Sequence, residues 1–359
     1  MEHRRVLEYG SEFDWDANRM YLKEDAQAPL IQDAVLVRSG RDALAAIALK
    51  HRDEYRRVLL PALCCISMVT PFSRNGYEPV FYTLHNSLMP DLKDIRAKIC
   101  GKALLVYMNY FGAPSLKPED MERIREEGDV ILVQDRTHDL LATREEKPVS
   151  DYTVASIRKW AALADGGLLH AGCGIMNEPS PDRTSLFARL RSSALEHKRI
   201  YLSTGDAGMK ERFRDEFERA NELLEDADAC CAMSPETREL LPHIDFAAVY
   251  NKRRLNVLAL SELVADIPGV LEAVKCPERS ALYYPIHVKN RNRLQSILAE
   301  QGVYCPVIWP IPAPAIGVCK TARTVAEHML AIPCDQRYGP EDMEYIACTL
   351  RRSMNELAG

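Results

Sequence analysis

Short apolar runs alternate with amphipathic stretches through the first two-thirds of the chain. Continuous apolar runs of this length are typical of strands buried on both faces, and strands that alternate with helices form a parallel sheet covered by helices. The pattern therefore predicts an α/β fold. The expected strands are residues 58–60, 79–82, 103–107, 130–134, 152–155 and 174–176, and helices between them include 41–57, 91–98 and 118–127.

The pattern changes in the last third of the chain. Residues 182–229 are charged and helical in pattern, with a turn signal at 204–206. Beyond them, helices are expected at 251–263, 290–301 and 340–357, and strands at 284–288 and 303–307. The change predicts two domains, a large one over residues 1–245 and a smaller α+β domain over residues 246–359.

Charge and cysteine usage exclude several classes of protein. Net charge is 46 − 52 = −6 over 359 residues, which leaves no basic field for nucleic acid. The longest apolar stretch, residues 58–69, contains a proline and is shorter than the roughly 20 residues that a membrane span needs. The N-terminus lacks the apolar core of a signal peptide. Eleven scattered cysteines are typical of reduced thiols in a cytoplasmic protein.

Common catalytic motifs are absent from the sequence. It contains no Walker-type phosphate loop, no G-x-G-x-x-G after a strand, no C-x-x-C and no H-E-x-x-H, so no metal site is predicted. Ser156 and Lys159 form a Ser-x-x-Lys, which also occurs in penicillin-recognising acyl-serine hydrolases. Those enzymes need Ser-Asp-Asn and Lys-Thr-Gly partners, which this chain lacks.

Three short segments carry the candidate chemistry. Asp135 ends the strand expected at 130–134, so it should lie at the carboxyl edge of the sheet, where open α/β folds bind ligands. Its alternative role is to cap the next turn. Lys159 lies just beyond the strand expected at 152–155, and its alternative is an ordinary surface lysine.

The third segment is a glycine turn that opens a helix. Free backbone N–H groups and the positive end of the helix dipole make the start of the helix an anion site, to which Arg41 could add a charge-assisted fork. A plain helix cap is the alternative. The segment is Ser39-Gly40-Arg41.

Taken together, the three segments meet the needs of pyridoxal 5′-phosphate. The cofactor's aldehyde needs a lysine, its pyridinium nitrogen needs a carboxylate, and its phosphate needs an anion cradle. The order along the chain, phosphate turn, aspartate and then Ser-x-x-Lys, resembles that of the aspartate-aminotransferase-like fold, fold type I.

In its short motifs and their order, the chain resembles the DegT-type family of sugar-nucleotide aminotransferases. The likeness covers about residues 30–175 and 247–355, and residues 180–245 have no match. It is carried by Ser39-Gly40-Arg41-Asp42-Ala43-Leu44 (family N/S-G-T-x-A-L), residues 60–81, VYMNYFGAPS at 106–115, Asp135-Arg136-Thr137-His138 (D-A-A-[HQ]), Ser156-x-x-Lys159 with Gly166-Gly167, Tyr250-Asn251-Lys252-Arg253 (G-x-N-x-R) and residues 284–310.

The resemblance implies a role for each site residue. Lys159 would bond covalently to the cofactor and shuttle protons, Asp135 would hold the pyridinium nitrogen, and His138 would lie near the ring hydroxyl. The phosphate would be bound by Ser39, Gly40, Arg41 and Ser156, with Asn251 reaching it from the other subunit of a homodimer.

Three positions depart from the family pattern. Arg41 replaces threonine, Cys65 stands where an aromatic ring usually stacks on the cofactor, and Val249 replaces glycine. For Asn251 the residues themselves leave a second interpretation, an N-cap of the helix expected at 251–263.

The function implied by the resemblance is transfer of an amino group from glutamate or glutamine to a nucleotide-linked keto sugar. Lys159 favours this over the family's dehydratase branch, which has histidine there. Two alternatives stay open: another fold-type-I reaction on an amino acid, and a non-catalytic binding protein that keeps the fold. No nucleic-acid or membrane partner is expected.

Overall fold

The largest element of the protein is a seven-stranded sheet with the order β2-β8-β7-β6-β5-β3-β4. The computed structural model describes residues 7–27, 30–113, 115–143, 150–172, 179–181, 185–225, 230–274 and 280–358. Strands β3 to β7 are parallel, β8 is antiparallel to β7, and β2 is antiparallel to β8. The predicted α/β fold with a mainly parallel sheet is thereby confirmed. The strands are β2 (Val35–Val37), β3 (Arg57–Pro61), β4 (Glu78–Tyr82), β5 (Ala103–Met108), β6 (Val130–Asp135), β7 (Tyr152–Ala155) and β8 (Gly167–Ala171).

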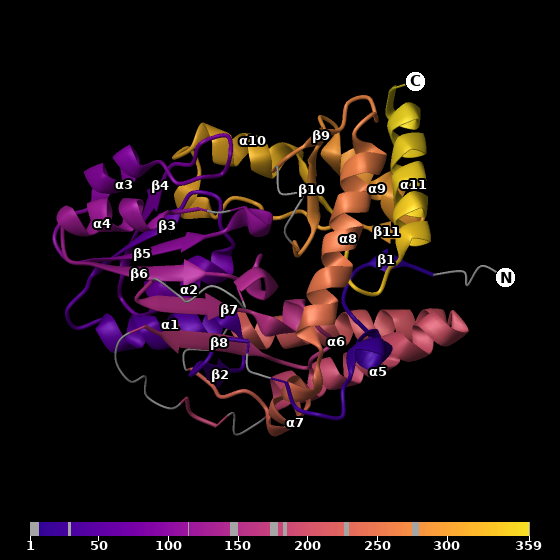
Figure 1. Ribbon diagram of the computed structural model, residues 1–359, viewed down its shortest axis with the longest axis horizontal. Helices are drawn as coiled ribbons and strands as arrows, with labels where there is room; N and C mark the ends of the chain where they lie inside the picture. Colours follow the sequence, from indigo (N-terminus) through magenta and orange to yellow (C-terminus); the bar gives the residue numbers. More distant parts are fainter. Residues whose placement is uncertain are drawn as a thin grey trace.

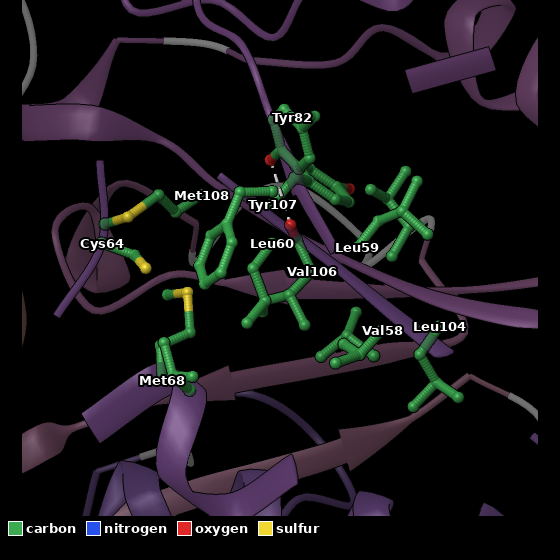
Figure 2. Packing of buried hydrophobic residues seen from close by; sticks show 14 of the residues in the cluster. Val58, Leu59, Leu60, Cys64, Met68, Tyr82, Leu104, Val106, Tyr107 and Met108 are labelled. Atoms are coloured by element: carbon green, nitrogen blue, oxygen red, sulfur yellow. Dashed lines mark hydrogen bonds between the residues drawn. The ribbon is translucent and has the colours of Figure 1, made fainter. Parts of the chain in front are cut away.

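Helices between the strands cover this sheet (Figure 1). They are α1 (Gly40–His51), α2 (Ile66–Arg74), α3 (Leu92–Lys98) and α4 (Pro118–Glu126). Figure 2 shows Met68 of α2 beside the side chains of the central strands, where the Tyr82 hydroxyl donates a hydrogen bond to the Val106 carbonyl at 3.0 Å. Val58, Leu60 and Val106 are fully buried, as expected for strands covered on both faces.

The structure corrects the strand and helix boundaries near the sheet's edges. The helix expected at 41–57 ends at His51, because the chain turns there and Arg57 already belongs to β3. Strand β8 was not predicted, since the pair Gly166-Gly167 is typical of a turn. Gly167 instead lets β8 pass close to the start of α1: a Cβ at Gly167 would lie 2.3 Å from the Ser39 carbonyl carbon. The strand expected at 174–176 lies outside the described residues.

Two long helices form a hairpin after the sheet. They are α5 (Leu186–Thr204) and α6 (Ala207–Glu225), and Gly205 ends α5 with φ of 74°, a left-handed conformation that suits glycine. The helical pattern and turn predicted between 182 and 229 are confirmed for the described residues. A short helix, α7 (Pro235–Leu240), follows.

The C-terminal part is built around a three-stranded antiparallel sheet, in the order β12-β10-β9. Its elements are β9 (Leu271–Glu272), β10 (Tyr284–His287), α9 (Arg291–Glu300), α10 (Lys320–His328), β12 (Met329–Ile332) and α11 (Pro340–Ala358). The strand expected at 303–307 is shorter, β11 (Val303–Tyr304), and pairs in parallel with β1 (Tyr9–Gly10). The amino-terminal segment therefore lies beside the C-terminal elements (Figure 1).

Helix α8 (Phe246–Val264) connects the two parts of the molecule. It begins at Phe246 rather than at Asn251, because Asp245 caps it by accepting a hydrogen bond from the Ala248 N–H at 3.1 Å. Its first turns pack beside the large sheet, and its later residues Val257 and Leu260 belong to the C-terminal core. The division of the chain into domains at 245/246 stays a prediction.

No helix among the described residues combines the length and apolarity needed to cross a membrane. The nine cysteines that the structure describes are all free thiols.

Candidate active site

Lys159 lies at the edge of the large sheet, directly beyond the end of β7. The chain forms a 3₁₀ turn over Ile157–Lys159, and the Ile157 N–H donates to the Gly166 carbonyl at 3.0 Å. The next residue, Trp160, is fully buried and donates its indole N–H to the Thr137 carbonyl at 2.8 Å. These bonds hold the lysine's turn against the segment that follows β6.

Asp135 is the last residue of β6 and pairs with Val154 of β7, so Asp135 and Lys159 follow adjacent strands. The Thr137 N–H donates to Asp135 Oδ1 at 2.8 Å. Burial raises the pKa of Asp135, while hydrogen bonds from Thr137 and the charge of Lys159 oppose the rise. Burial likewise lowers the pKa of Lys159, against the attraction of Asp135. The carboxylate and the amine thus act on each other electrostatically. Their roles toward the cofactor stay a prediction.

His138 is buried between two aromatic rings. Its ring stacks on Trp309 with centroids 5.0 Å apart, and Phe111 lies 4.8 Å away. Burial and the nearby charge of Lys159 together lower the pKa of His138 to about 3. The imidazole is therefore neutral at physiological pH. Nδ1 accepts a hydrogen bond from the Phe111 N–H at 3.4 Å, whereas Nε2 is buried without a partner among the described residues.

The glycine turn of α1 lies against Ser156. Ser39 caps the helix by accepting a hydrogen bond from the Asp42 N–H at 3.2 Å. A Cβ at Gly40 would lie 3.4 Å from the Ser156 Cβ, so the turn and Ser156 are in contact distance of each other. The structure thus brings together Ser39, Gly40 and Ser156, three of the residues predicted to bind phosphate, at the positive end of a helix.

Arg41 extends the same site. Its Nε and Nη1 atoms are buried and have no hydrogen-bond partner among the described residues, and burial lowers the pKa of its guanidinium. A buried guanidinium with unused donors is unfavourable unless an anion binds to it. The replacement of threonine by Arg41 therefore fits a phosphate group.

Two further positions that the sequence singled out are Cys65 and Asn251. Cys65 precedes α2 at the helix N-cap and is half-buried; in its ionised form it would raise the pKa of both Lys159 and Arg41. Asn251 lies inside α8 with its side chain exposed, so its interpretation as a helix N-cap was wrong. The intersubunit role of Asn251 stays a prediction.

A cavity of about 700 Å³ opens beside Lys159 and His138, which both line it. Its other walls come from Arg158 and from distant segments of the chain: the amino-terminal segment, α6, α8, the residues before β10, α9, the stretch after β11 and the stretch after β12. Among these lining residues are Glu12, Arg158, Asn221, Arg253, Trp309 and Arg337.

Sequence signals for these wall residues were weak. Arg158 stands next to Lys159, and Arg253 ends the Tyr250–Arg253 motif; Arg253 lies over the Trp160 ring at 4.7 Å and donates to Gln336 Oε1 at 2.8 Å. Glu12 and Trp309 have no local pattern that marks them, because they reach the cavity only through the packing of the amino- and carboxy-terminal segments.

A family model settles what kind of protein has this site. The model of the DegT/DnrJ/EryC1/StrS aminotransferase family matches residues 30–351. The chain belongs to this family. The predicted family, fold type and transferase class are confirmed, and with them pyridoxal phosphate as the cofactor. The match also spans residues 180–245, where no likeness could be found from the sequence alone.

Solved structures support the fold. S. venezuelae DesV, in complex with a ketimine intermediate, is 17% identical, with 92% of this chain and 90% of DesV covered and a TM-score of 0.63. Helicobacter pylori PseC, an aminotransferase involved in the biosynthesis of pseudoaminic acid, is 14% identical, with 97% of this chain and 100% of PseC covered and a TM-score of 0.65. The putative sugar aminotransferase Spr1654 of Streptococcus pneumoniae is 13% identical to this chain. Its PLP form has a TM-score of 0.66, with 98% of this chain and 99% of Spr1654 covered. Its PMP form has a TM-score of 0.67, with 97% and 99% covered. No curated protein matches the chain significantly.

Proposed function

We propose that this aminotransferase transfers an amino group from glutamate or glutamine to a keto sugar carried on a nucleotide. The observation that carries the proposal is the position of Lys159, which follows the strand next to that of Asp135 and lines a cavity large enough for a bulky substrate. Two structural neighbours, the sugar aminotransferase CalS13 from Micromonospora echinospora and the H. pylori PseC aminotransferase of pseudoaminic acid biosynthesis, agree with a sugar acceptor.

Different residues of the site would bind the phosphate and the ring nitrogen of the cofactor. Ser39, Gly40, Ser156 and Arg41 would bind its phosphate, because they offer a helix N-terminus, a hydroxyl and unused guanidinium donors. Asp135 would hold the proton of the ring nitrogen. When bound, pyridoxal phosphate supplies an aldehyde that condenses with amines and a ring that accepts electrons.

Lys159 and His138 then act on the substrate side. The lowered pKa of Lys159 makes its amine available as a nucleophile and as a base that moves a proton between the reacting carbon atoms. Neutral His138, held by Phe111 and Trp309, offers Nε2 to a neighbouring oxygen without adding a second positive charge beside Lys159.

We further propose that the protein works in the cytoplasm as a homodimer in which Asn251 of each subunit completes the other's phosphate site. Asn251 is exposed on α8, and Leu255, one helical turn further on, has 59% of its surface exposed. An exposed leucine beside an exposed asparagine supports a partner on this face.

The proposed reaction can be tested in two halves by absorbance. Purified protein loaded with cofactor should absorb near the visible edge, and glutamate or glutamine should remove that band. Adding a keto sugar nucleotide to the donor-treated protein should restore it and yield an amino sugar detectable by mass spectrometry. The keto sugar without its nucleotide is the matched control for the nucleotide.

The other outcomes identify the alternatives. A protein that shows no such band even with excess cofactor would be a binding protein. A protein that releases carbon dioxide, an aldehyde or sulfide from an amino acid would be another fold-type-I enzyme, and either result would overturn the proposal.

A further inference from the structure

Arg158, the residue before Lys159, turns its side chain to the same cavity. Both residues line it, together with Glu12 of the amino-terminal segment and Asn221 of α6. The family resemblance gave Arg158 no role, and the cofactor site described above does not use it.

The cavity has two other arginines in its wall, and both have strong partners. Arg337 donates two bonds of 2.8 Å to the Asp335 carboxylate and a third to the Glu12 carbonyl at 3.1 Å. Arg253 donates to Gln336 and to the Leu282 carbonyl. By contrast, Nε of Arg158 is buried without a partner, and no carboxylate of the described residues forms an ion pair with its guanidinium.

Positive charge is in excess around Arg158. Arg191, which is buried, lies over the same Phe187 ring, with the two guanidinium carbons 5.9 and 6.0 Å from its centroid. Burial lowers the pKa of Arg158 to about 10, with Arg191 and Arg41 contributing, against the pull of Glu12. Glu12 is itself bound to Arg191 at 3.1 Å. The carboxylates that act on Arg158 are Glu12 and Asp165, and Asp165 also accepts hydrogen bonds from Ser234. They stand against the guanidinium groups of Arg158, Arg191 and Arg41 and the nearby Lys159 amine.

An anion bound in the cavity would satisfy the unused donor and reduce the charge excess. The geometry points to Arg158 as the residue that binds an acidic group, a carboxylate or a phosphate, of the substrate. The inference rests on the proposed function and narrows it, because it requires that the amino donor or the acceptor carries an acidic group in addition to the reacting one.

A substrate group fits Arg158 better than the cofactor phosphate does. Arg158 lines the cavity, whereas Ser39, Gly40 and Arg41 do not. Arg41 already offers two unused guanidinium nitrogens beside the glycine turn. Arg158 would therefore be available to bind a ligand on the cavity side of Lys159.

The test measures binding to the cofactor-loaded protein, so it does not depend on turnover. Two probes stand for the two sources: glutarate for a dicarboxylic amino donor, and inorganic pyrophosphate for a nucleotide-linked acceptor. Titration calorimetry of wild type, Arg158→Gln and Arg158→Lys should show that Arg158→Gln weakens binding of at least one probe about tenfold or more, the scale of a lost hydrogen bond between charged groups. Arg158→Lys, which keeps the charge, should lose less.

The controls separate this role from folding and from cofactor binding. Arg123→Gln, at an arginine of α4 with 61% of its side chain exposed, should leave both probes unchanged. Cofactor affinity of each variant is measured in parallel. The inference is overturned if wild type binds neither probe, if Arg158→Gln and Arg158→Lys bind both as wild type does, or if only their cofactor affinity falls. Arg158-dependent probe binding in a protein that aminates no keto sugar would overturn the proposed function alone.

Discussion

Two desolvated lysines show how differently the two ends of this site are built. Lys159 and Lys198 are both desolvated, and burial lowers the pKa of each. Lys198 is fully enclosed by partners: it forms an ion pair with Glu8 at 2.8 Å and donates to Ser11 Oγ at 2.7 Å and to the Glu12 carbonyl. Lys159 forms no hydrogen bond or ion pair with the described residues and faces the cavity.

The comparison separates a reactive lysine from a structural one. The cofactor end, around Lys159, is assembled from the ends of adjacent strands and leaves its amine free. At the substrate end, Lys198 of α5 bonds to Ser11 of the amino-terminal segment, which lies 187 positions earlier in the chain. Chemistry therefore depends on the first lysine, and the shape of the cavity wall depends on the second.

Removing the reactive lysine should have the largest effect. Lys159→Ala should reduce amino transfer to the background rate, because nucleophile and proton carrier are lost together. Rates of the donor half-reaction measure the effect, with Lys93→Ala, at an exposed lysine of α3, as the control. Residual turnover above a few per cent would mean that another amine does the chemistry.

Removing the charge of Asp135 should have the second largest effect on turnover. Asp135→Asn keeps the shape and the hydrogen bond from Thr137 but removes the charge, so turnover should fall by roughly two or more orders of magnitude. The same absorbance assay, run at saturating cofactor, measures it. Near-normal turnover would show that a different acid holds the ring nitrogen.

At the substrate end, Lys198→Met should reduce the free energy of unfolding by about 2 kcal/mol. The cost stays below the roughly 3–5 kcal/mol of a broken buried pair, because Lys210 still lies 3.4 Å from Glu8. Urea denaturation measures it, and no change in stability would contradict the structural role of Lys198.

The Lys198–Glu8 ion pair should also make stability depend on pH. Burial raises the pKa of Glu8, but the charges of Lys198 and Lys210 outweigh it and hold the pKa below its ordinary value of 4.5. This contribution to stability is fully present above that value and is lost as the pH falls through the lower, folded-state pKa. The loss of stability on acidification should therefore be smaller in Lys198→Met than in wild type.

Asn251→Ala should have the smallest effect on stability. The side chain is exposed within α8 and caps nothing, so the change in unfolding free energy should stay within about 0.5 kcal/mol. If Asn251 completes the partner's phosphate site, the variant should nevertheless release cofactor more readily on dialysis. Sedimentation of the wild type should show a dimer, and a monomer that keeps its cofactor and turns over would exclude the shared site.

The placement of Asp135 and Lys159 after neighbouring strands could be predicted from the sequence, for a physical reason. Parallel strands end at one edge of a sheet, so Asp135 and Lys159 could be placed near each other from their positions after apolar runs alone. Ser39 and Gly40 followed from the chemistry of a helix start. Strand β8 was missed because Gly167 serves close packing and not a turn.

The substrate end could not be predicted in the same way. Glu12 pairs with Arg191 and Trp309 stacks on His138, and these contacts join segments far apart in the chain, which no local pattern encodes. Asn251 was assigned a helix cap as an alternative because the apolar periodicity becomes clear only after it, whereas Asp245 begins the helix.

Covalent trapping tests the central claim, that Lys159 is the reactive lysine, most directly. The cofactor-loaded protein is reduced with borohydride, digested and mapped by mass spectrometry. We expect a single pyridoxyl-modified peptide that carries the group on Lys159, in wild type and in Lys198→Met alike. A label on Lys198, or on any lysine other than Lys159, would contradict it.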